Sequence, residues 1–264
     1  MRKKILYVVS MLLLISMICG SVSIAHGKYA NEVRGLPVLM YHSVSNEKCA
    51  NAFIIPVWKF RQQMHYLKRN GYTTLSINDA LSFLNHGRAI PEKSVLLTFD
   101  DGYGNIYSNA FPILKKFGFK ASVFIITATI DRNKDYLTSW QLKFMSRHGI
   151  DIESHTLNHG NLKLLSYEQQ FNALMLSRNK IERLVGKKVL SIAYPYGEYN
   201  CLTLKAAKNA GYKIAFTTTP GYAKRLRGLL NIRRIGMYRT DTLNMFKNKV
   251  GNYNLLISLF EKYL

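Results

Sequence analysis

The sequence predicts an α/β fold, a distorted (β/α) barrel with about seven parallel strands. Short apolar segments alternate with longer amphipathic ones, glycines follow most of the amphipathic segments, and no internal repeat interrupts this order. Strand-then-helix order predicts parallel strands with helices outside them. About seven such units favour a closed or nearly closed barrel, with an open doubly wound sheet as the alternative. The 264 residues, 48% of them hydrophobic, allow one substantial core and a single domain.

The predicted elements follow from the period of the apolar residues. Short segments of four to six residues, most of them apolar and short enough to be buried on both faces, predict strands at 38–41, 95–99, 121–126, 151–154, 189–194, 214–217 and 232–235. Apolar residues at helical spacing predict helices at 57–69, 77–85, 106–117, 139–147, 167–185, 202–209 and from 242 onward. Glycines that can cap helix ends follow several of these, at Gly71, Gly118, Gly149, Gly186 and Gly211.

The beginning of the chain has the pattern of an export signal. Basic residues at positions 2–4 precede an apolar run from Ile5 to Cys19, and small residues follow as far as Ala25. We therefore predict a signal peptide at 1–25, a linker at 26–36 and the folded domain at 37–264. An uncleaved N-terminal membrane anchor is the alternative, because the run is nearly long enough to span a bilayer. Either way the domain is expected to be secreted or attached to the cell surface or envelope.

The chain is strongly cationic, with a formal net charge of +22. Removal of the predicted signal, with its three basic residues, leaves +19. The basic residues are scattered and do not form a tail or a recognition helix, and an exported protein rarely meets DNA or RNA, so nucleic acid is not the expected partner. We predict binding to anionic polymers of the cell envelope or to a membrane surface. Nothing in the sequence indicates an obligate protein partner.

Two cysteines, Cys49 and Cys201, remain after the predicted signal. Each follows a motif segment described below, so one interpretation is a disulfide at the rim of the site. Two unpaired thiols are the alternative, because a single pair does not make a disulfide framework.

An acidic pair follows one of the predicted strands, in the segment Leu97-Thr-Phe-Asp-Asp-Gly-Tyr103. Adjacent strand side chains point to opposite faces, so Asp100 and Asp101 can enter one pocket only if the chain turns there, and Gly102 permits a turn. Two neighbouring carboxylates repel each other unless a cation or a shared proton relieves them. Asp-Asp-Gly is also a common surface turn, but the buried type of strand before it favours a site.

A histidine pair follows another predicted strand, in Glu153-Ser-His-Thr-Leu-Asn-His159. Histidines four residues apart can bind one metal ion, although a pair at this spacing also arises by chance. Together with Asp101, His155 and His159 form a two-histidine, one-carboxylate set that leaves coordination positions open for water and substrate. We predict a divalent metal ion there, Zn²⁺ by ligand type.

Two further segments end predicted strands with polar or aromatic residues. Ala193-Tyr-Pro-Tyr-Gly197 is an ordinary strand-ending turn or, functionally, a rigid loop that presents the backbone N–H of Tyr196 to a developing oxyanion. Met40-Tyr-His42 brings a histidine to a strand end, where a single histidine is as often structural as catalytic. Tyr103, Tyr194 and Pro195 flank these motifs and are the predicted substrate contacts, although aromatic residues more often serve packing.

Together these segments resemble the polysaccharide deacetylase family, also called the NodB-homology family or carbohydrate esterase family 4. The resemblance covers roughly residues 36–234, and it implies the barrel fold. It also implies that Asp100 is the catalytic base and that Asp101, His155 and His159 are the metal ligands.

Two features of that family are not evident in this sequence. The arginine that often precedes the Pro-aromatic-Gly turn and orients the catalytic aspartate is replaced by Ala193, and no histidine follows His159 to act as the general acid. The early Met-Tyr-His and the arginine-free Tyr-Pro-Tyr-Gly are similar to the branch of poly-β-1,6-N-acetyl-D-glucosamine N-deacetylases. That similarity implies a catalytic role for His42.

The implied reaction is metal-assisted hydrolysis of N-acetyl groups on an extracellular amino-sugar polysaccharide. Peptidoglycan, chitin oligomers and acetylxylan are alternative substrates for the same centre. A different class, an inactive cationic glycan-binding protein of the envelope, is disfavoured by the intact Asp100, Asp101, His155 and His159.

Overall fold

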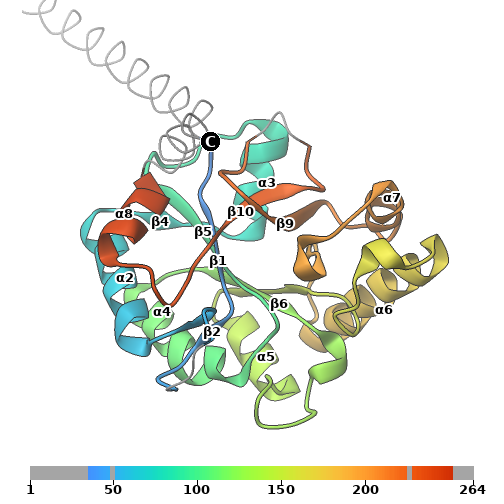
Figure 1. The fold of residues 1–264 in the computed structure, drawn as a ribbon, viewed down its shortest axis with the longest axis horizontal. Coiled ribbons are helices and arrows are strands. Elements are labelled where there is room, and N and C mark those ends of the chain that lie inside the picture. Colours follow the sequence, from blue (N-terminus) through green and yellow to red (C-terminus); the bar gives the residue numbers. More distant parts are fainter. Residues whose placement is uncertain (1–34, 48–50, 225–227, 252–264) are drawn as a thin grey trace, which may run out of the picture.

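A closed barrel of seven parallel strands lies at the centre of the computed structural model, which describes residues 35–47, 51–224 and 228–251 (Figure 1). The strands follow one another around the barrel and β5 pairs back with β1, which closes it. The predicted barrel is confirmed, and the open sheet is excluded. The strands are β1 Val38–Tyr41, β5 Ser94–Phe99, β6 Ala121–Ile125, β7 Ile150–Ser154, β8 Ser191–Ala193, β9 Ile214–Pro220 and β10 Ile232–Gly236.

Helices surround the barrel, and most lie where the apolar period predicts them (Figure 1). Ser76, Thr138, Ser166 and Asn200 each cap the helix that follows with a reciprocal side-chain bond. No helix of the described residues is long and apolar enough to cross a membrane. The helices are α2 Val57–Arg69, α3 Ile77–His86, α4 Phe111–Phe117, α5 Ser139–Arg147, α6 Tyr167–Val185, α7 Cys201–Asn209 and α8 Leu243–Gly251.

Some short elements differ from the expectation. The helix predicted at 106–117 is divided into a π-helical turn, η1 Ile106–Ala110, and α4. Three two-residue strands, β2 Ser43–Val44, β3 Ile54–Ile55 and β4 Thr73–Thr74, were not predicted, because two residues show no period. Single turns of 3₁₀ helix occur at η2 Thr127–Thr129, η3 Leu162–Leu164 and η4 Pro195–Gly197.

Alternation along the strands separates two apolar clusters. On β5, Val95, Leu97 and Phe99 belong to the larger cluster, which also contains residues of the surrounding helices. Leu96 belongs to a second cluster with side chains of the other strands and with α3. Because alternate residues of a strand point to opposite faces, this second cluster fills the barrel interior, and α3 closes its amino-terminal end. The carboxyl ends of the strands form the opposite end, which we call the mouth.

Candidate active site at the mouth of the barrel

The two acids after β5 occupy different environments although they are adjacent. Asp100 continues the inward alternation of Leu96 and Thr98, and only 2% of it is exposed. Its N–H donates to the carbonyl of Tyr41 on β1 at 2.9 Å. Asp101 has a left-handed backbone with φ of 71°, followed by Gly102 at 76°. The chain therefore turns at Asp101 itself, and this turn brings its carboxylate to the mouth instead of the outer face of the strand.

A buried arginine holds Asp100. Arg234 on β10 donates to both carboxylate oxygens of Asp100, from Nη1 at 2.7 Å and from Nη2 at 2.6 Å. Its side chain is fully buried, lies near the rings of Phe124 and Phe216, and also donates to the carbonyl of Thr217. Burial alone would raise the pKa of Asp100, but the Arg234 charge and hydrogen bonds outweigh it and lower that pKa to about 2. Asp100 is therefore ionised and rigidly oriented.

Arg234 is the arginine partner of the catalytic aspartate that the sequence did not reveal. The segment before the Tyr-Pro-Tyr-Gly turn has no arginine, but the aspartate does have an arginine partner, which comes from a strand 134 residues further along the chain. An arginine in the middle of an apolar strand, Asn231-Ile-Arg-Arg-Ile235, was the available signal, since a buried arginine needs a charged partner.

The two histidines converge on Asp101. His155 follows β7 and is almost fully buried, and its Nδ1 donates to the carbonyl of Ala193 at 2.7 Å. That bond leaves the Nε2 lone pair facing the mouth, 3.4 Å from Oδ1 of Asp101. His159 Nε2 lies 3.5 Å from the same oxygen. Ala193 thus serves the site through its backbone carbonyl, which sets the tautomer of His155.

These three side chains fit a divalent metal ion. One ligand atom from each of Asp101, His155 and His159 lies within 4.8 Å of the others. Two imidazole nitrogens and one carboxylate oxygen suit Zn²⁺ and several other divalent metals and leave positions open. Burial lowers the pKa of His155, but the neighbouring Asp101 carboxylate outweighs it and raises that pKa, as expected where negative charge gathers for a cation.

Backbone strain is concentrated at the same place. Among the described residues other than glycine, positive φ occurs at Asp131 and at four residues of the mouth, Asp101, Thr156, His159 and Tyr196. A left-handed backbone costs a residue with a side chain roughly 1–2 kcal/mol. The surrounding structure must hold each of them there, which is typical of functional sites.

His42 lies at the end of β1 and beside Asp101 on the wall of a cleft. Its ring packs against Phe53 at 4.6 Å, and its Nδ1 is buried with no hydrogen-bond partner among the described residues. Burial lowers the pKa of His42 although Asp100 and Asp101 act to raise it. The lowered pKa favours the neutral ring, and Nδ1 is a buried nitrogen that no described side chain satisfies.

Tyr196 combines an exposed side chain with a constrained backbone. It has φ of 59° in the η4 turn, and its ring meets the edge of His159 at a centroid distance of 4.6 Å. The carbonyl of Tyr196 accepts a bond from Thr218 at 3.1 Å. Gly197 is required beside it, because a Cβ there would lie 2.1 Å from the Thr218 hydroxyl. The turn is rigid, and it places Tyr196 beside the histidine pair.

Comparisons with known proteins agree with this geometry. A sequence model described as polysaccharide deacetylase matches residues 87–215. YxkH of Bacillus subtilis (strain 168), named for the same family, is 42% identical over 200 residues that cover 76% of this chain and 70% of YxkH. This chain belongs to the polysaccharide deacetylase family. Members of this family are hydrolases that remove acetyl groups, and the chain is a hydrolase of this type.

Two further similar proteins are a poly-β-1,6-N-acetyl-D-glucosamine N-deacetylase and a deacetylase of known structure. The poly-β-1,6-N-acetyl-D-glucosamine N-deacetylase of Staphylococcus aureus (strain MRSA252) is 31% identical over 205 residues, which cover 68% of this chain and 70% of that enzyme. The solved structure of the Streptococcus pyogenes deacetylase PplD in complex with acetate is 32% identical and superposes with a TM-score of 0.78, over 82% of this chain and 98% of PplD.

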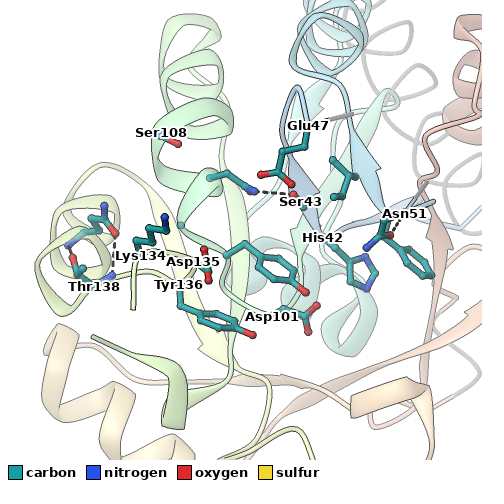
Figure 2. A pocket seen from close by; sticks show the side chains of 16 residues that line it. His42, Ser43, Glu47, Asn51, Asp101, Ser108, Lys134, Asp135, Tyr136 and Thr138 are labelled. Carbon is teal, nitrogen blue, oxygen red and sulfur yellow. Dashed lines mark hydrogen bonds between the residues drawn. The ribbon is translucent and has the colours of Figure 1, made fainter. Parts of the chain in front are cut away.

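The mouth of this deacetylase opens into a cleft of about 730 Å³ (Figure 2). Asp101 and His42 line one end of it, and Tyr103 and Tyr136 stack on each other in its wall at 5.6 Å. Burial and the Asp101 carboxylate raise the pKa of Tyr103, so its hydroxyl stays protonated beside the acid. Because Tyr103 lines the cleft, a polymer in the cleft could reach it, and its predicted contact with substrate stays a prediction.

Two predicted substrate contacts of the deacetylase are wrong. Tyr194 is fully buried, its hydroxyl donates to the carbonyl of Leu230 at 3.1 Å, and its ring stacks on Tyr199. Pro195 is also buried, so its ring shapes the turn and does not meet the polymer. Cys201 begins α7 and is exposed, whereas Cys49 lies outside the described residues, so their pairing stays a prediction. The predicted signal at 1–25 lies outside them as well.

Proposed function

We propose that this deacetylase removes N-acetyl groups from an extracellular amino-sugar polysaccharide of the poly-β-1,6-N-acetylglucosamine type, with a divalent metal ion, Zn²⁺ by ligand type. The observation that carries the proposal is the Asp101, His155 and His159 triad at the edge of an open cleft, beside an aspartate held by Arg234. The name of the Staphylococcus aureus relative supports the choice of polymer.

The metal ion would acidify a water molecule and polarise the acetamide carbonyl. Asp100, ionised and oriented by Arg234, accepts a proton from the attacking water as the new C–O bond forms. Both Asp100 oxygens accept bonds from Arg234, but each retains a second lone pair for this proton. The Tyr196 N–H donates to the carbonyl oxygen as negative charge develops on it.

The C–N bond then breaks and the amine must leave with a proton. His42 is the proposed donor. Its ring is neutral at the start because burial lowers its pKa, so it first receives the proton that Asp100 took and then releases it readily to the leaving nitrogen. Acetate and a free amine are the products, and Asp100 and His42 return to their starting states.

Release of acetate from defined polymers tests the proposal. The protein is incubated with poly-β-1,6-N-acetylglucosamine, chitin oligomers, peptidoglycan and acetylxylan, with and without chelator, and with Zn²⁺ or another divalent metal added back. We expect the largest release from the first polymer, loss with chelator and recovery with metal. Equal release with chelator would remove the metal from the proposal, and faster release from another polymer would change the substrate.

Binding to the polymer without acetate release after metal is restored would contradict the proposed reaction. We further propose that the protein is exported through its N-terminal segment and works outside the cytoplasm, where such polymers occur. The strongly positive charge then favours contact with anionic components of the envelope.

A further inference from the structure

Charged residues are divided unequally between the two ends of the barrel. The loops at the mouth carry nearly balanced charges among the described residues. Asp100 and Asp241 are buried and paired with Arg234 and Lys249, which leaves Glu47, Asp101, Asp131, Asp135 and Glu198 against Arg132, Lys134, Lys163 and Arg239. The loops that lead from a helix into the next strand carry six cations and one acid: Arg88, Lys93, Lys120, Lys187, Lys188 and Lys213 against Glu92. These loops, 87–93, 118–120, 186–190 and 210–213, form what we call the basal face.

The basal cations are exposed and only partly neutralised. All six are exposed to solvent. Two of them pair with acids, Lys120 with Asp79 at 2.8 Å and Lys188 with Glu182 at 3.6 Å. Lys93 donates to the carbonyl of Asn70, so its ammonium group is held at the surface without losing its charge. The ends of four helices add Arg69, Lys116, Arg147 and Lys208 to the same end of the barrel.

The chain also enters the fold at the basal face. Leu36 precedes β1 and pairs with Ala223, and Gly35 and Leu36 line a small pocket together with Lys93 and Val250. The two ends of the described domain therefore lie side by side there (Figure 1). The sequence before Gly35 contains the apolar run Ile5 to Cys19, which is followed by fifteen residues up to the domain.

The linker length does not decide which end of the domain meets a membrane. Fifteen residues reach up to about 50 Å when extended, which is roughly the diameter of a domain of this size. Charge does decide it, because anionic headgroups attract the excess cations of the basal face, whereas the charges at the mouth nearly balance. We propose that the basal face binds the anionic phospholipid surface of a membrane and turns the mouth away from it. This inference does not depend on the substrate proposed above.

A vesicle-binding experiment on the full chain tests the proposal. One variant replaces Arg88, Lys93, Lys188 and Lys213 with glutamine. The matched control replaces Arg61, Arg132, Lys143 and Lys205, which are exposed cations away from the basal loops, with glutamine as well. Its net charge therefore equals that of the basal variant. Binding is measured by co-sedimentation with vesicles of phosphatidylglycerol and phosphatidylcholine and with vesicles of phosphatidylcholine alone. The apolar N-terminal run is common to all three proteins, so it cancels in the comparison.

Orientation can be read from the native tryptophans. Trp58 and Trp140 are the only two, and both are exposed near the starts of α2 and α5, which lie toward the mouth. Energy transfer from them to a dansyl lipid falls steeply with distance. We expect weak transfer from the bound protein if the basal face meets the lipid.

The expected result is a loss of affinity for anionic vesicles of roughly fivefold per basal charge removed, little loss in the control, and release by high salt. Unchanged thermal unfolding would show that the variants are folded. Equal losses in the two variants, strong tryptophan transfer, or binding to soluble poly(glycerol phosphate) without binding to anionic vesicles would each overturn the proposal.

Discussion

At the mouth of the barrel, residues with side chains join glycines in left-handed backbone positions, whereas at the basal end only glycines among the described residues occupy them. Asp101, Thr156, His159 and Tyr196 have φ between 59° and 71°, and the helix ends at Gly87, Gly118 and Gly186 have φ between 65° and 68°. Glycine adopts this conformation without a Cβ penalty. At the mouth the strain falls on two candidate metal ligands, Asp101 and His159, and on Thr156 and Tyr196 beside them, whereas the basal turns only connect helix to strand.

The packing of the two ends differs in the same way. The basal end is filled by apolar side chains from the strands and from α3. The mouth end buries a charged pair, Asp100 and Arg234, which stabilises the fold less than apolar packing would but fixes one carboxylate in place. Changes at the mouth should therefore affect activity first, and changes in the apolar packing at the base should affect stability and not activity.

The largest expected effect is on catalysis at the mouth. Asp100→Asn should lower acetate release by roughly 10²–10⁴-fold while metal binding remains, because it removes the proton acceptor and keeps the three predicted ligands. It should also lower stability, because the buried Arg234 charge loses its carboxylate partner. His155→Ala should lose both acetate release and metal binding, because it removes a ligand. Acetate release and metal content per protein check this. Full metal-dependent activity in the Asp100→Asn variant would contradict the role of Asp100.

Arg234→Met should affect both properties. It leaves the Asp100 carboxylate buried without its partner, which costs about 3–5 kcal/mol in the free energy of unfolding, and it releases the orientation of the base. Urea unfolding and acetate release measure the two effects. The double variant Asp100→Asn, Arg234→Met should recover part of the stability but no activity. If the single variant were as stable as the native protein, the pair would not be buried as described.

At the base, Phe83→Ala should change stability alone. Phe83 on α3 is 3% exposed within the interior cluster, so the cavity left there costs about 3–5 kcal/mol. Activity per folded molecule should stay within about twofold, because a cavity at the basal end does not move the residues of the mouth. The exposed Leu164 provides the control, as Leu164→Ala should cost little. A large fall in the activity of the folded Phe83→Ala variant would break the division between the two ends.

Glu153, on β7 between the two ends, should make stability depend on pH. Burial raises its pKa well above 4.5, although it accepts bonds from the N–H groups of Leu190 and Ser191. Its stabilising contribution is complete below pH 4.5 and is lost as pH rises through the folded pKa, since the unfolded chain ionises first. Glu153→Gln should therefore gain stability relative to the native protein as pH rises above 4.5.

Unfolding in urea across that pH range measures the difference between Glu153→Gln and the native protein. Glu92→Gln, at an exposed basal position, should show no such trend. A difference for Glu153→Gln that stays constant with pH would mean that the carboxyl of Glu153 is ionised in the fold.

The smallest effect is expected at a basal helix cap. Gly118 has φ of 68° and open space where a Cβ would be, so Gly118→Ala adds only the left-handed penalty of roughly 1–2 kcal/mol. Thermal unfolding should detect this loss, and acetate release should not change. A loss much above that range would indicate contacts at Gly118 that the structure does not show.

Much of the architecture could be predicted from local patterns. The ranges of α2, α5, α6 and β1 match their predicted bounds, because long amphipathic periods, caps and apolar runs are local properties. The two-residue strands and the π-helical turn were missed, because such short segments carry no periodic signal. Tyr194 was misplaced for a related reason: a residue beside a motif can point inward or outward, and only the register of β8 decides which.

By itself the sequence determined the strand-and-helix order, the polar residues at the strand ends and the pair His155 and His159, since each depends on residue types at short spacing. Asp101 joined that pair in the predicted metal set because it also follows a strand. Only the tertiary structure decided that Arg234 is the partner of Asp100, that the carbonyl of Ala193 sets the His155 tautomer, and that positive charge gathers opposite the mouth. Those features join segments far apart in the chain, and barrel closure is what brings them into contact.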